Sequence, residues 1–461
     1  MFDMSKMDLS GKKVLVIGSG LSGVGAVKLL REAGAIPVLL DENEKAVVSD
    51  IRERLGETDG ADTRIIIGKL QDEIIEQLTL AVPSPAVPLD SEIICRLRDH
   101  QVGIWSEIEL AYNYAQGRLI AITGTNGKTT TTTLVGEIMK AYYNSVFVVG
   151  NIGYSYAGQA RSTQSDSVTV AEISSFQLEA VENFHANVSA ILNITPDHLN
   201  RHHTMECYVQ VKEQIANRQT QEDTCVLNYD NDYTRAFGEV CPAKVVFFSS
   251  HQKLQRGLYL DGEEIILAGD SEPVRLMNIH DMNLVGLCNV ENVMAAIAIA
   301  MAMQVPMETV LRVVRMFKAV EHRIEFVATK KGVDYYNDSK GTNPDAAIQG
   351  IRAMSRKTYL IGGGYDKGSE YDEWIESFEG KVKELVLIGQ TREKIASCAE
   401  KHGFSQIHFA DTFEDAMNYC TGQAQAGEAV LLSPACASWD MFPNYEMRGK
   451  IFKSYVNQLD D

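Results

Sequence analysis

The stretch AITGTNGKTTTTTLV, residues 121–135, joins an apolar run to a glycine turn, a lysine and five consecutive threonines. Gly124 and Gly127 leave room for backbone amides to wrap a chain of phosphates. Lys128 would place a positive charge beside the outer phosphates, and the Thr129 hydroxyl can ligate Mg²⁺. A strand pattern before the turn and a helical pattern after it argue against a merely solvated lysine. The stretch therefore predicts a shortened, GxxGKT-type ATP-binding turn.

The residues around this turn predict a domain with a mainly parallel sheet. Strand patterns occupy residues 118–124, 167–174 and 187–195. The helix after the turn has an apolar face made of Leu134, Val135, Ile138 and Met139. Residues 257–267 predict a hairpin that turns at Asp261-Gly262, and residues 287–303 predict an apolar core helix.

A second glycine turn, VLVIGSGLSG at residues 14–23, lies near the start of the chain. Gly18, Gly20 and Gly23 follow a strand and open a helix at 21–33. The predicted inward face of that helix comprises Leu21, Val24, Val27 and Leu30. Asp41 ends the next strand, which completes the pattern of a Rossmann dinucleotide site. The residues leave open NAD, FAD or another diphosphate ligand, and also glycines that serve packing alone.

The two turns together favour one class of protein over two others. A dehydrogenase would not need the ATP-binding turn, and a nucleotide-driven switch or motor would not need the first turn. An ATP-dependent ligase that acts on a nucleotide-linked substrate needs both.

Three successive series of strand and helix patterns predict an α/β protein of three domains. We predict a Rossmann-like N-terminal domain at 1–103, a central P-loop ATPase at 104–319 and a Rossmann-like C-terminal domain at 320–461. The strand patterns of the third series are TYLIGG, LVLIG, IHFA and AVLLS.

The composition limits the partners and the compartment. Forty-three basic and 62 acidic residues give a net charge of −19, which disfavours nucleic acid and anionic membranes. Eight cysteines are scattered without a CxxC pair, as expected of reduced thiols. No apolar segment predicts a signal peptide or a membrane span. We expect a cytoplasmic protein without membrane insertion.

Polar residues follow two of the buried strands of the central domain. Glu172 ends one strand, and Asp197 and His198 follow another, where ligands collect in open α/β sheets. A carboxylate and an imidazole beside a triphosphate suit a Mg²⁺ site, although each residue alone also fits a strand-end hydrogen bond. Tyr208 and Lys212 share one face of a helix, where a solvated lysine is the ordinary expectation.

Several of these motifs together resemble a known family. GTNGKTT, EISSFQLE, NITPDHLNRH and the spacing from His198 to Lys212 resemble the Mur ligases of bacterial cell-wall synthesis. YNDSKGTNPDA (336–346) and LLSPACASWDMF (431–442) are similar to the members that add D-glutamate. The resemblance covers the whole chain in order. It implies ATP-dependent ligation of D-glutamate to UDP-N-acetylmuramoyl-L-alanine, by a monomer, in the cytoplasmic steps of peptidoglycan synthesis.

The resemblance also implies roles for individual residues. The ATP-binding residues it implies are Gly124, Thr125, Asn126, Gly127, Lys128, Thr129, Thr130, Asn292, Arg323, Asp338 and Lys340. It implies a UDP-sugar site with Leu21, Ser22, Asp41, Ser84 and Asn151. The implied D-glutamate pocket comprises Thr342, Lys367, Ser438 and Tyr445. The implied catalytic residues are Lys128, Glu172, His198 and Lys212.

Two Mg²⁺ ions belong to the implied site. Thr129 and Glu172 match ligands of the first ion. His198 and Lys212 match ligands of the second, with Lys212 carbamylated by CO₂, which replaces the expectation of a solvated lysine. The implied reaction passes through an acyl phosphate. Ser438 is expected to follow a strand and to open a helix. The amides of that helix could receive one carboxylate of D-glutamate, and Lys367 could pair with the other carboxylate.

Some residues depart from the family pattern, and two alternative functions remain open. Cys288 stands where relatives often have histidine, Gly341 where they have alanine, and Asp41 is followed by Glu42-Asn43 rather than by a pair containing arginine. The enzymatic rival is a folylpolyglutamate synthase, which would not need the first glycine turn. The other rival is a nucleotide-sensing switch without chemistry.

Overall fold

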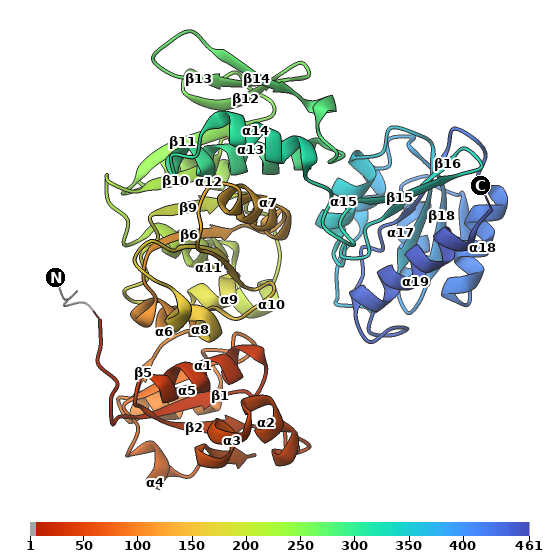
Figure 1. Ribbon diagram of the computed structural model, residues 1–461. Coiled ribbons are helices and arrows are strands. Elements are labelled where there is room, and N and C mark those ends of the chain that lie inside the picture. Colours follow the sequence, from red (N-terminus) through yellow and green to blue (C-terminus); the bar gives the residue numbers. More distant parts are fainter. Residues whose placement is uncertain (1–5, 461) are drawn as a thin grey trace. The chain divides into compact units, whose positions relative to one another are not determined.

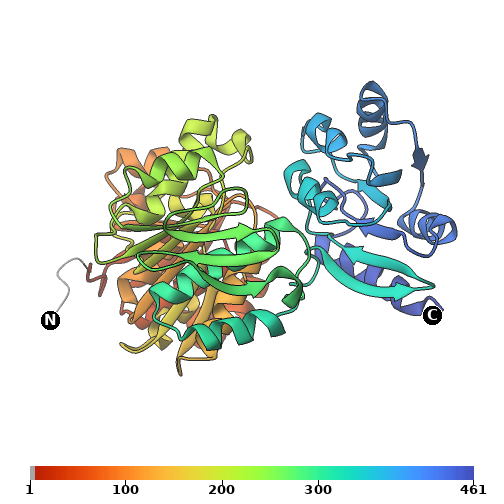
Figure 2. The same cartoon turned by 90° about the horizontal axis from the view of Figure 1, so that it is seen from above.

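The computed structural model describes residues 6–460, which form three β-sheets (Figure 1; Figure 2). The chain divides into two compact units. One contains the chain as far as Met277 together with Val293–Val314, and the other contains Asn278–Asn292 and the residues from Arg315 onward. Two sheets lie in the first unit and one in the second. Most strands of each sheet alternate with α-helices along the chain, as the predicted α/β class requires.

The N-terminal sheet has the strand order β3-β2-β1-β4-β5, and all its pairs are parallel. Its strands are β1 (Lys13–Ile17), β2 (Ile36–Asp41), β3 (Arg64–Ile67), β4 (Leu80–Pro83) and β5 (Gly103–Ile104). Its helices are α1 (Leu21–Glu32), α2 (Val48–Leu55), α3 (Glu57–Asp62), α4 (Asp72–Ile75) and α5 (Glu92–Asp99). Val14 and Val16 pack in one core cluster with α1, whereas Leu15 and Ile17 pack in another with α5. Both faces of β1 are therefore buried, which explains its unbroken apolar sequence.

The central sheet is larger, with the order β14-β13-β12-β11-β10-β9-β6-β8-β7. Its strands are β6 (Arg118–Thr123), β7 (Val146–Gly150), β8 (Val168–Glu172), β9 (Val188–Ile191), β10 (Thr224–Asn228), β11 (Lys244–Ser249), β12 (Gly257–Asp261), β13 (Glu264–Ala268) and β14 (Val274–Asn278). Among themselves, strands β6 to β12 form parallel pairs only, and β12 and β13 form an antiparallel hairpin. The sheet is thus mainly parallel, as predicted.

Short and long helices accompany this sheet. They are α6 (Glu107–Tyr114), α7 (Lys128–Lys140), α8 (Tyr156–Gln159), α9 (Ser175–Leu178), α10 (Leu199–His202), α11 (Met205–Glu213), α12 (Asp232–Gly238), α13 (Leu287–Ala302) and α14 (Met307–Met316), with 3-10 turns η1 (Ala160–Ser162), η2 (Gln214–Ala216) and η3 (Ile279–Asp281). The predicted apolar face of α7 is fully buried. Across residues 6–460, no helix combines the length and the hydropathy that a membrane crossing requires.

The sheet of the second unit has the order β15-β16-β20-β17-β18-β19, and only its β15–β16 pair is antiparallel. Its strands are β15 (Glu325–Lys330), β16 (Val333–Asn337), β17 (Thr358–Gly363), β18 (Val382–Ile388), β19 (Ile407–Phe409) and β20 (Ala429–Leu432). Its helices are α15 (Pro344–Arg352), α16 (Asp372–Glu376), α17 (Arg392–Lys401), α18 (Phe413–Gln423) and α19 (Tyr445–Gln458). Separate core clusters lie on its two faces, built around Leu360 and Ile361 of β17.

Two local predictions are wrong. Leu21 is 80% exposed rather than inward, because it is the first residue of α1 and extends beyond the sheet that buries Val27 and Leu30. The hairpin turns at Gly262-Glu263, one residue later than predicted, because Asp261 still pairs with Glu264. Gly262 has φ +60°, which favours glycine there.

Candidate functional site

The first glycine turn lies at the carboxyl edge of the N-terminal sheet, where the strand order reverses between β1 and β4. Ligands bind at such edges in open α/β sheets. The backbone amide of Ser84, after β4, donates to the Ile17 carbonyl at 2.7 Å. Gly23 is needed because a Cβ there would lie 1.9 Å from the Gly18 carbonyl oxygen. The predicted UDP-sugar residues Leu21, Ser22, Asp41 and Ser84 therefore share this edge.

Asp41 is held by the glycine turn itself. Its Oδ2 accepts a hydrogen bond from the Ser19 amide at 3.1 Å, and its Oδ1 accepts from the Asn43 amide at 3.0 Å. Burial opposes the charged form, but the hydrogen bonds from the Ser19 hydroxyl and from these two amides, with the charge of Arg54, outweigh it and lower the pKa of Asp41. The Arg54 guanidinium donates to the Ser19 carbonyl at 2.7 Å, which brings a cation to the turn that the sequence analysis missed. Arg54 lies in α2, thirty-five residues from Ser19, so no local motif marks it.

The phosphate turn connects β6 to α7, and β6 lies between β8 and β9. Gly127 has φ +84° and precedes the helix directly. The Lys128 ammonium donates to the carbonyls of Gly124 and Thr125, each at 2.7 Å, so the lysine closes over its own turn. Thr129 and Thr130 are buried in the first turn of α7.

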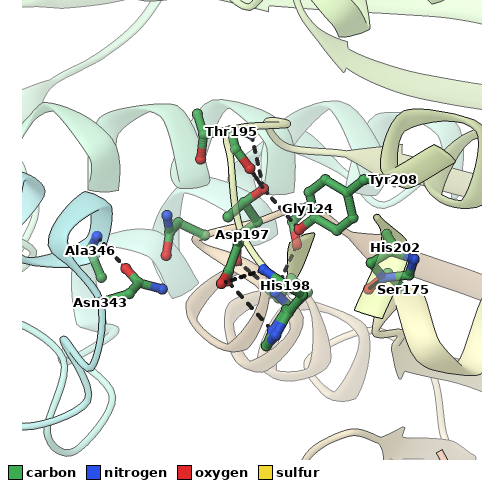
Figure 3. Close-up of polar contacts among 12 residues, drawn as sticks. Gly124, Ser175, Thr195, Asp197, His198, His202, Tyr208, Asn343 and Ala346 are labelled. Carbon is green, nitrogen blue, oxygen red and sulfur yellow. Dashed lines mark hydrogen bonds and ion pairs between the residues drawn. The ribbon is translucent and has the colours of Figure 1, made fainter. Parts of the chain in front are cut away.

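Residues after β9 brace this turn. The Asn126 amide donates to the Asn193 Oδ1 at 2.8 Å, and the Thr125 amide donates to the Asn193 carbonyl at 2.9 Å. The Thr125 hydroxyl contacts the Tyr208 hydroxyl at 3.1 Å and accepts from the Thr195 amide at 3.0 Å. Figure 3 shows Thr195 and Tyr208 close to Gly124. The sequence analysis did not assign Asn193 a role, although it belongs to the quoted NITPDH segment.

Glu172 is buried at the end of β8. Its Oε1 accepts a hydrogen bond from the Asn151 side-chain amide at 2.9 Å. Its Oε2 is buried without a hydrogen-bond partner among the described residues. A buried carboxylate oxygen without a donor suits a cation ligand. Asn151 thus lies just after β7, at the carboxyl edge of the central sheet and beside a predicted metal residue.

Lys212 is only 1% exposed, although the ordinary expectation for an isolated lysine is a solvated one. Its ammonium donates to the Gly124 carbonyl at 2.8 Å and lies 4.7 Å from the centre of the Tyr208 ring. Burial, followed by the charge of Lys128, lowers the pKa of Lys212 well below its usual range. Tyr208 and Lys212 therefore share one face of α11, as predicted, and that face is buried.

His198 precedes α10 with φ +53°, an unusual conformation for a residue with a side chain. Its amide donates to the Asp197 Oδ1 at 2.9 Å, and its Nε2 lies 3.5 Å from the Asp197 Oδ2 (Figure 3). The Phe176 ring lies 4.9 Å from the His198 ring, centre to centre. His198 follows β9, so it lies at the same carboxyl edge of the central sheet as Lys128 after β6 and Glu172 at the end of β8.

His202, which the sequence did not single out, is also buried close to these residues. It lies near Ser175, with His202 Nε2 3.0 Å from the hydroxyl (Figure 3). Burial, then the charges of His198 and Lys212, lowers the pKa of His202 to about 4. The neighbouring Arg201 pairs with Glu179 and donates to the Val87 carbonyl at 2.9 Å, linking the central domain to the N-terminal one.

In the second unit, the predicted ATP residues are Asp338 and Lys340, which follow β16, Arg323, which precedes β15, and Asn292 in α13. Asp338 is buried, where it accepts from the Ser433 hydroxyl at 2.7 Å and from the Ile324 amide at 3.2 Å. Burial raises the pKa of Asp338 to about 7, although these hydrogen bonds and Arg323 act in the opposite direction. The Lys340 ammonium lies 5.4 Å from the centre of the Tyr445 ring. Asn292 is buried in α13, where its side-chain amide donates to the Asn289 Oδ1 at 3.2 Å.

Three of the predicted D-glutamate residues lie in the loops after β16, β17 and β20, three neighbouring strands, and the fourth, Tyr445, begins α19. Thr342 follows β16, and Lys367 is exposed in the loop after β17. Ser438 follows β20 and is 2% exposed. The expectation that Ser438 opens a helix is wrong. Its carbonyl closes a turn by accepting from the amides of Met441 and Phe442, and α19 begins only at Tyr445.

A buried arginine joins two of these loops. Arg448 of α19 is 1% exposed and donates to the Ser339 carbonyl at 2.8 Å and to the Cys436 carbonyl at 3.3 Å. Ser339 belongs to the DSKGTN segment and Cys436 to the SPACASWD segment. Arg448 thereby fixes the two segments against each other. Sequence analysis missed it because its spacing from either segment carries no motif.

Comparison with known proteins adds three family models. The Mur ligase MurD-like N-terminal domain matches residues 12–106, the Mur ligase middle domain residues 122–300, and the Mur ligase glutamate ligase domain residues 322–436. The chain belongs to the Mur ligase family. The predicted resemblance and the three-domain architecture are confirmed.

Individual Mur ligases match along nearly the whole chain. A UDP-N-acetylmuramoylalanine–D-glutamate ligase from Lachnospira eligens is 56% identical and covers 98% of this chain and 100% of its own. The protein of the same name from Lachnoclostridium phytofermentans is 53% identical and covers 99% and 100%.

Solved Mur ligase structures share the fold at low identity. The UDP-N-acetylmuramate–alanine ligase from Thermotoga maritima has a TM-score of 0.59 at 18% identity, covering 97% of this chain and 99% of its own. A MurF ligase from the same organism, solved in complex with ADP, has a TM-score of 0.58 at 16% identity and covers 98% and 96%.

Proposed function

We propose that the protein joins D-glutamate to UDP-N-acetylmuramoyl-L-alanine, using ATP, in the cytoplasmic assembly of peptidoglycan precursors. The observation that carries this proposal is the match, over 98% or more of the chain, to relatives named for that ligation. The geometry agrees, because a phosphate turn, a buried carboxylate and a buried lysine meet at one sheet edge.

The reaction begins with activation of the substrate carboxylate. A carboxylate oxygen of the L-alanine residue attacks the γ-phosphorus of ATP, the bond to the β–γ bridging oxygen breaks, and ADP leaves. The resulting acyl phosphate is attacked by the D-glutamate amine, which loses a proton, and the tetrahedral intermediate expels phosphate. Lys128 at the phosphate turn stabilises the charge on the phosphate that is transferred. No protein nucleophile is required, because the phosphoryl group passes directly to the substrate.

Two Mg²⁺ ions fit the residues at this edge. Glu172, with its buried free oxygen, and Thr129 would hold the first ion, and His198 and Lys212 would hold the second. Bound Mg²⁺ would supply charge neutralisation for the ATP phosphates.

For Lys212 we propose a carbamate. The neutral amine adds to the carbon of CO₂ and releases one proton, which converts a buried neutral amine into a buried, negatively charged, carboxylate-like ligand. Its burial favours the neutral amine that this step needs.

The remaining residues divide between the two substrates. We propose that Leu21, Ser22, Asp41 and Ser84 contact the nucleotide part of the UDP-sugar, with Asn151 nearer the reacting end, because it lies beside Glu172. Lys367, Thr342, Ser438 and Tyr445 would receive the two carboxylates of D-glutamate. The ATP would also contact Asn292, Arg323, Asp338 and Lys340.

One assay tests the proposal. Purified protein, as a monomer by size-exclusion chromatography, is incubated with ATP, Mg²⁺ and UDP-N-acetylmuramoyl-L-alanine, and phosphate release is measured with D-glutamate, L-glutamate, L-alanine and L-lysine. We expect turnover with D-glutamate alone. Equal use of the two glutamate enantiomers would contradict the assignment, and turnover with a folate acceptor would favour the folylpolyglutamate synthase alternative. ATP binding without any turnover would favour a nucleotide-sensing switch.

A further inference from the structure

Two helices of the second unit present a mixed set of metal-binding side chains to each other. Asp372 and Glu376 are one helical turn apart on α16. Cys398 and His402 are likewise one turn apart at the end of α17, where His402 follows the last helical residue. Residues four apart share a helix face, so each pair faces in one direction. None of these four residues takes part in the proposed ligation.

The ligand atoms of three of these residues converge. A carboxylate oxygen of Asp372, the Cys398 Sγ and a His402 ring nitrogen all lie within 4.8 Å of one another. His402 Nε2 lies 2.9 Å from the Asp372 Oδ1. Tetrahedral Zn²⁺ keeps its nitrogen, oxygen and sulfur ligands at about 2.0–2.3 Å, which separates the ligand atoms by roughly 3.3–3.8 Å. Small side-chain rotations would therefore bring the three atoms around one ion.

The fourth residue supplies an independent observation. The other ring nitrogen of His402, Nδ1, lies 3.4 Å from the Glu376 Oε1. Histidines that bind metal commonly donate their second N–H to a carboxylate, which fixes the tautomer and the ring orientation. Glu376 is placed for that role while Asp372 faces the ligating nitrogen. A simple His–carboxylate ion pair would need neither the second carboxylate nor a thiol that is 9% exposed between the helices.

We propose that Asp372, Cys398 and His402 form a binding site for a borderline-soft divalent transition metal of the Zn²⁺ class, with Glu376 orienting His402 and water completing the coordination. Thiolate and imidazole ligands select Zn²⁺ over Mg²⁺, which prefers oxygen, so the site is chemically distinct from the proposed Mg²⁺ sites. Metal binding displaces the Cys398 thiol proton to solvent.

An ion here would join α16 to α17. Helix α16 follows the loop that carries Lys367, and α17 contacts that loop, because Lys394 of α17 donates to the Ser369 carbonyl at 2.8 Å and lies 3.7 Å from the Asp366 carboxylate. The metal would thus stabilise the part of the second unit that supports this loop.

Cobalt titration of the full-length protein tests the site, with excess Mg²⁺ present to occupy the oxygen-rich sites. We expect one equivalent of Co²⁺ to give a sulfur-to-cobalt charge-transfer absorption with tetrahedral d–d bands, both abolished by added Zn²⁺. Cys398→Ser should remove the charge-transfer band. Cys95→Ser, which removes an exposed thiol in the first unit, is the matched control and should keep the band. Glu376→Gln should keep the band with an affinity about 10–100-fold lower.

Thermal unfolding provides a second measurement. Zn²⁺ should raise the melting temperature of the unmodified protein and of Cys95→Ser, but not that of His402→Gln, whose folding is checked by circular dichroism. His402→Gln decides the question if Cys398→Ser does not fold. A weak octahedral cobalt spectrum in the unmodified protein, or an unchanged charge-transfer band in a folded Cys398→Ser or His402→Gln variant, would overturn the proposal.

Discussion

Lys128 and Lys212 both donate to the same carbonyl, that of Gly124, at 2.7 and 2.8 Å. They differ in their surroundings. Lys128 begins α7 beside the predicted phosphate site, whereas Lys212 is fully enclosed and its pKa is lowered well below the usual range, first by burial and then by Lys128. Two ammonium groups on one carbonyl repel each other, and that repulsion favours a neutral Lys212. The same side chain can therefore serve as a cation at one position and as a reactive amine at the other.

Lys128→Ala should lower the ligation rate by about 10²–10³, because it removes an electrostatic stabiliser of the transferred phosphate. Steady-state phosphate release measures this loss. Lys140→Ala, at the exposed far end of the same helix, is the matched control and should stay close to normal. UDP-sugar affinity measured by calorimetry should be nearly unchanged, because the proposed contacts with its nucleotide part lie on the N-terminal sheet. Near-normal turnover of Lys128→Ala would mean that the turn is only structural.

Lys212→Ala should lose activity and regain part of it when formate or acetate is added. A small carboxylate can occupy the space left by the proposed carbamate and ligate the proposed ion. Lys212→Arg should stay inactive, because a guanidinium does not take up CO₂. Formate should not rescue Lys128→Ala, which provides the control. A fully active Lys212→Ala variant would contradict the carbamate.

Two short helices of the central domain are joined by a buried carboxyl group. Helix α6 packs against α8, which lies beside the loop that carries Asn151. Glu107, in the first turn of α6, accepts a hydrogen bond from the Ala157 amide of α8 at 2.6 Å, and its other oxygen is buried without a partner among the described residues. Burial raises the pKa of Glu107 to about 7, although the Ala157 amide and Gln177 favour the charged form. The contact therefore joins two helices through a carboxyl group that stays protonated up to about pH 7.

Glu107→Gln should change how stability depends on pH. Between pH 4.5 and 7 the unfolded chain ionises Glu107 while the folded protein keeps the proton, so the unmodified protein loses up to about 1.4 kcal/mol per pH unit from this group. The variant lacks that loss, so its stability relative to the unmodified protein should rise with pH up to about 7 and then level off. Urea unfolding at several pH values measures the difference. Glu92→Gln, on the exposed face of α5, is the control, and a pH-independent difference for Glu107→Gln would contradict the prediction.

The whole molecule distributes its predicted sites over two units. The glycine turns and the residues Glu172, His198 and Lys212 belong to the first unit. The residues expected to bind D-glutamate, together with Asn292, Arg323, Asp338 and Lys340, belong to the second. Substrates bound to different units should respond independently to a substitution in one of them. The chain's net charge of −19 makes local cations such as Lys367 necessary for binding an anionic amino acid.

Lys367→Met should raise the KM for D-glutamate by about 10- to 150-fold, the value of one charge-assisted hydrogen bond of about 1.5–3 kcal/mol. The affinities for ATP and the UDP-sugar should remain nearly unchanged, because their predicted contacts lie elsewhere. Steady-state kinetics and calorimetry give the three values. Lys401→Met, an exposed lysine at the end of α17, is the matched control. An unchanged KM would remove Lys367 from the pocket.

The sequence by itself determined the three α/β domains, the two glycine turns and the strand that ends at Glu172. These features are local. Apolar runs with period-specific spacing define strands and helices, and glycine turns require particular residues at fixed offsets. The shared helix face of Tyr208 and Lys212 followed from helical spacing, but its burial did not. Local patterns failed at element ends, where Leu21 extends past the sheet and where α19 begins seven residues after Ser438.

Only the tertiary structure decided which distant residues meet. Arg54 reaches the first glycine turn from α2, Asn193 braces the phosphate turn from the segment after β9, and Arg448 joins two loops from α19. Likewise, Asp372 and His402 meet although thirty residues separate them. No sequence spacing encodes these contacts, because each depends on how strands are ordered in a sheet and how helices pack on it. The lowered pKa of Lys212 has the same origin, since burial is a property of the folded chain.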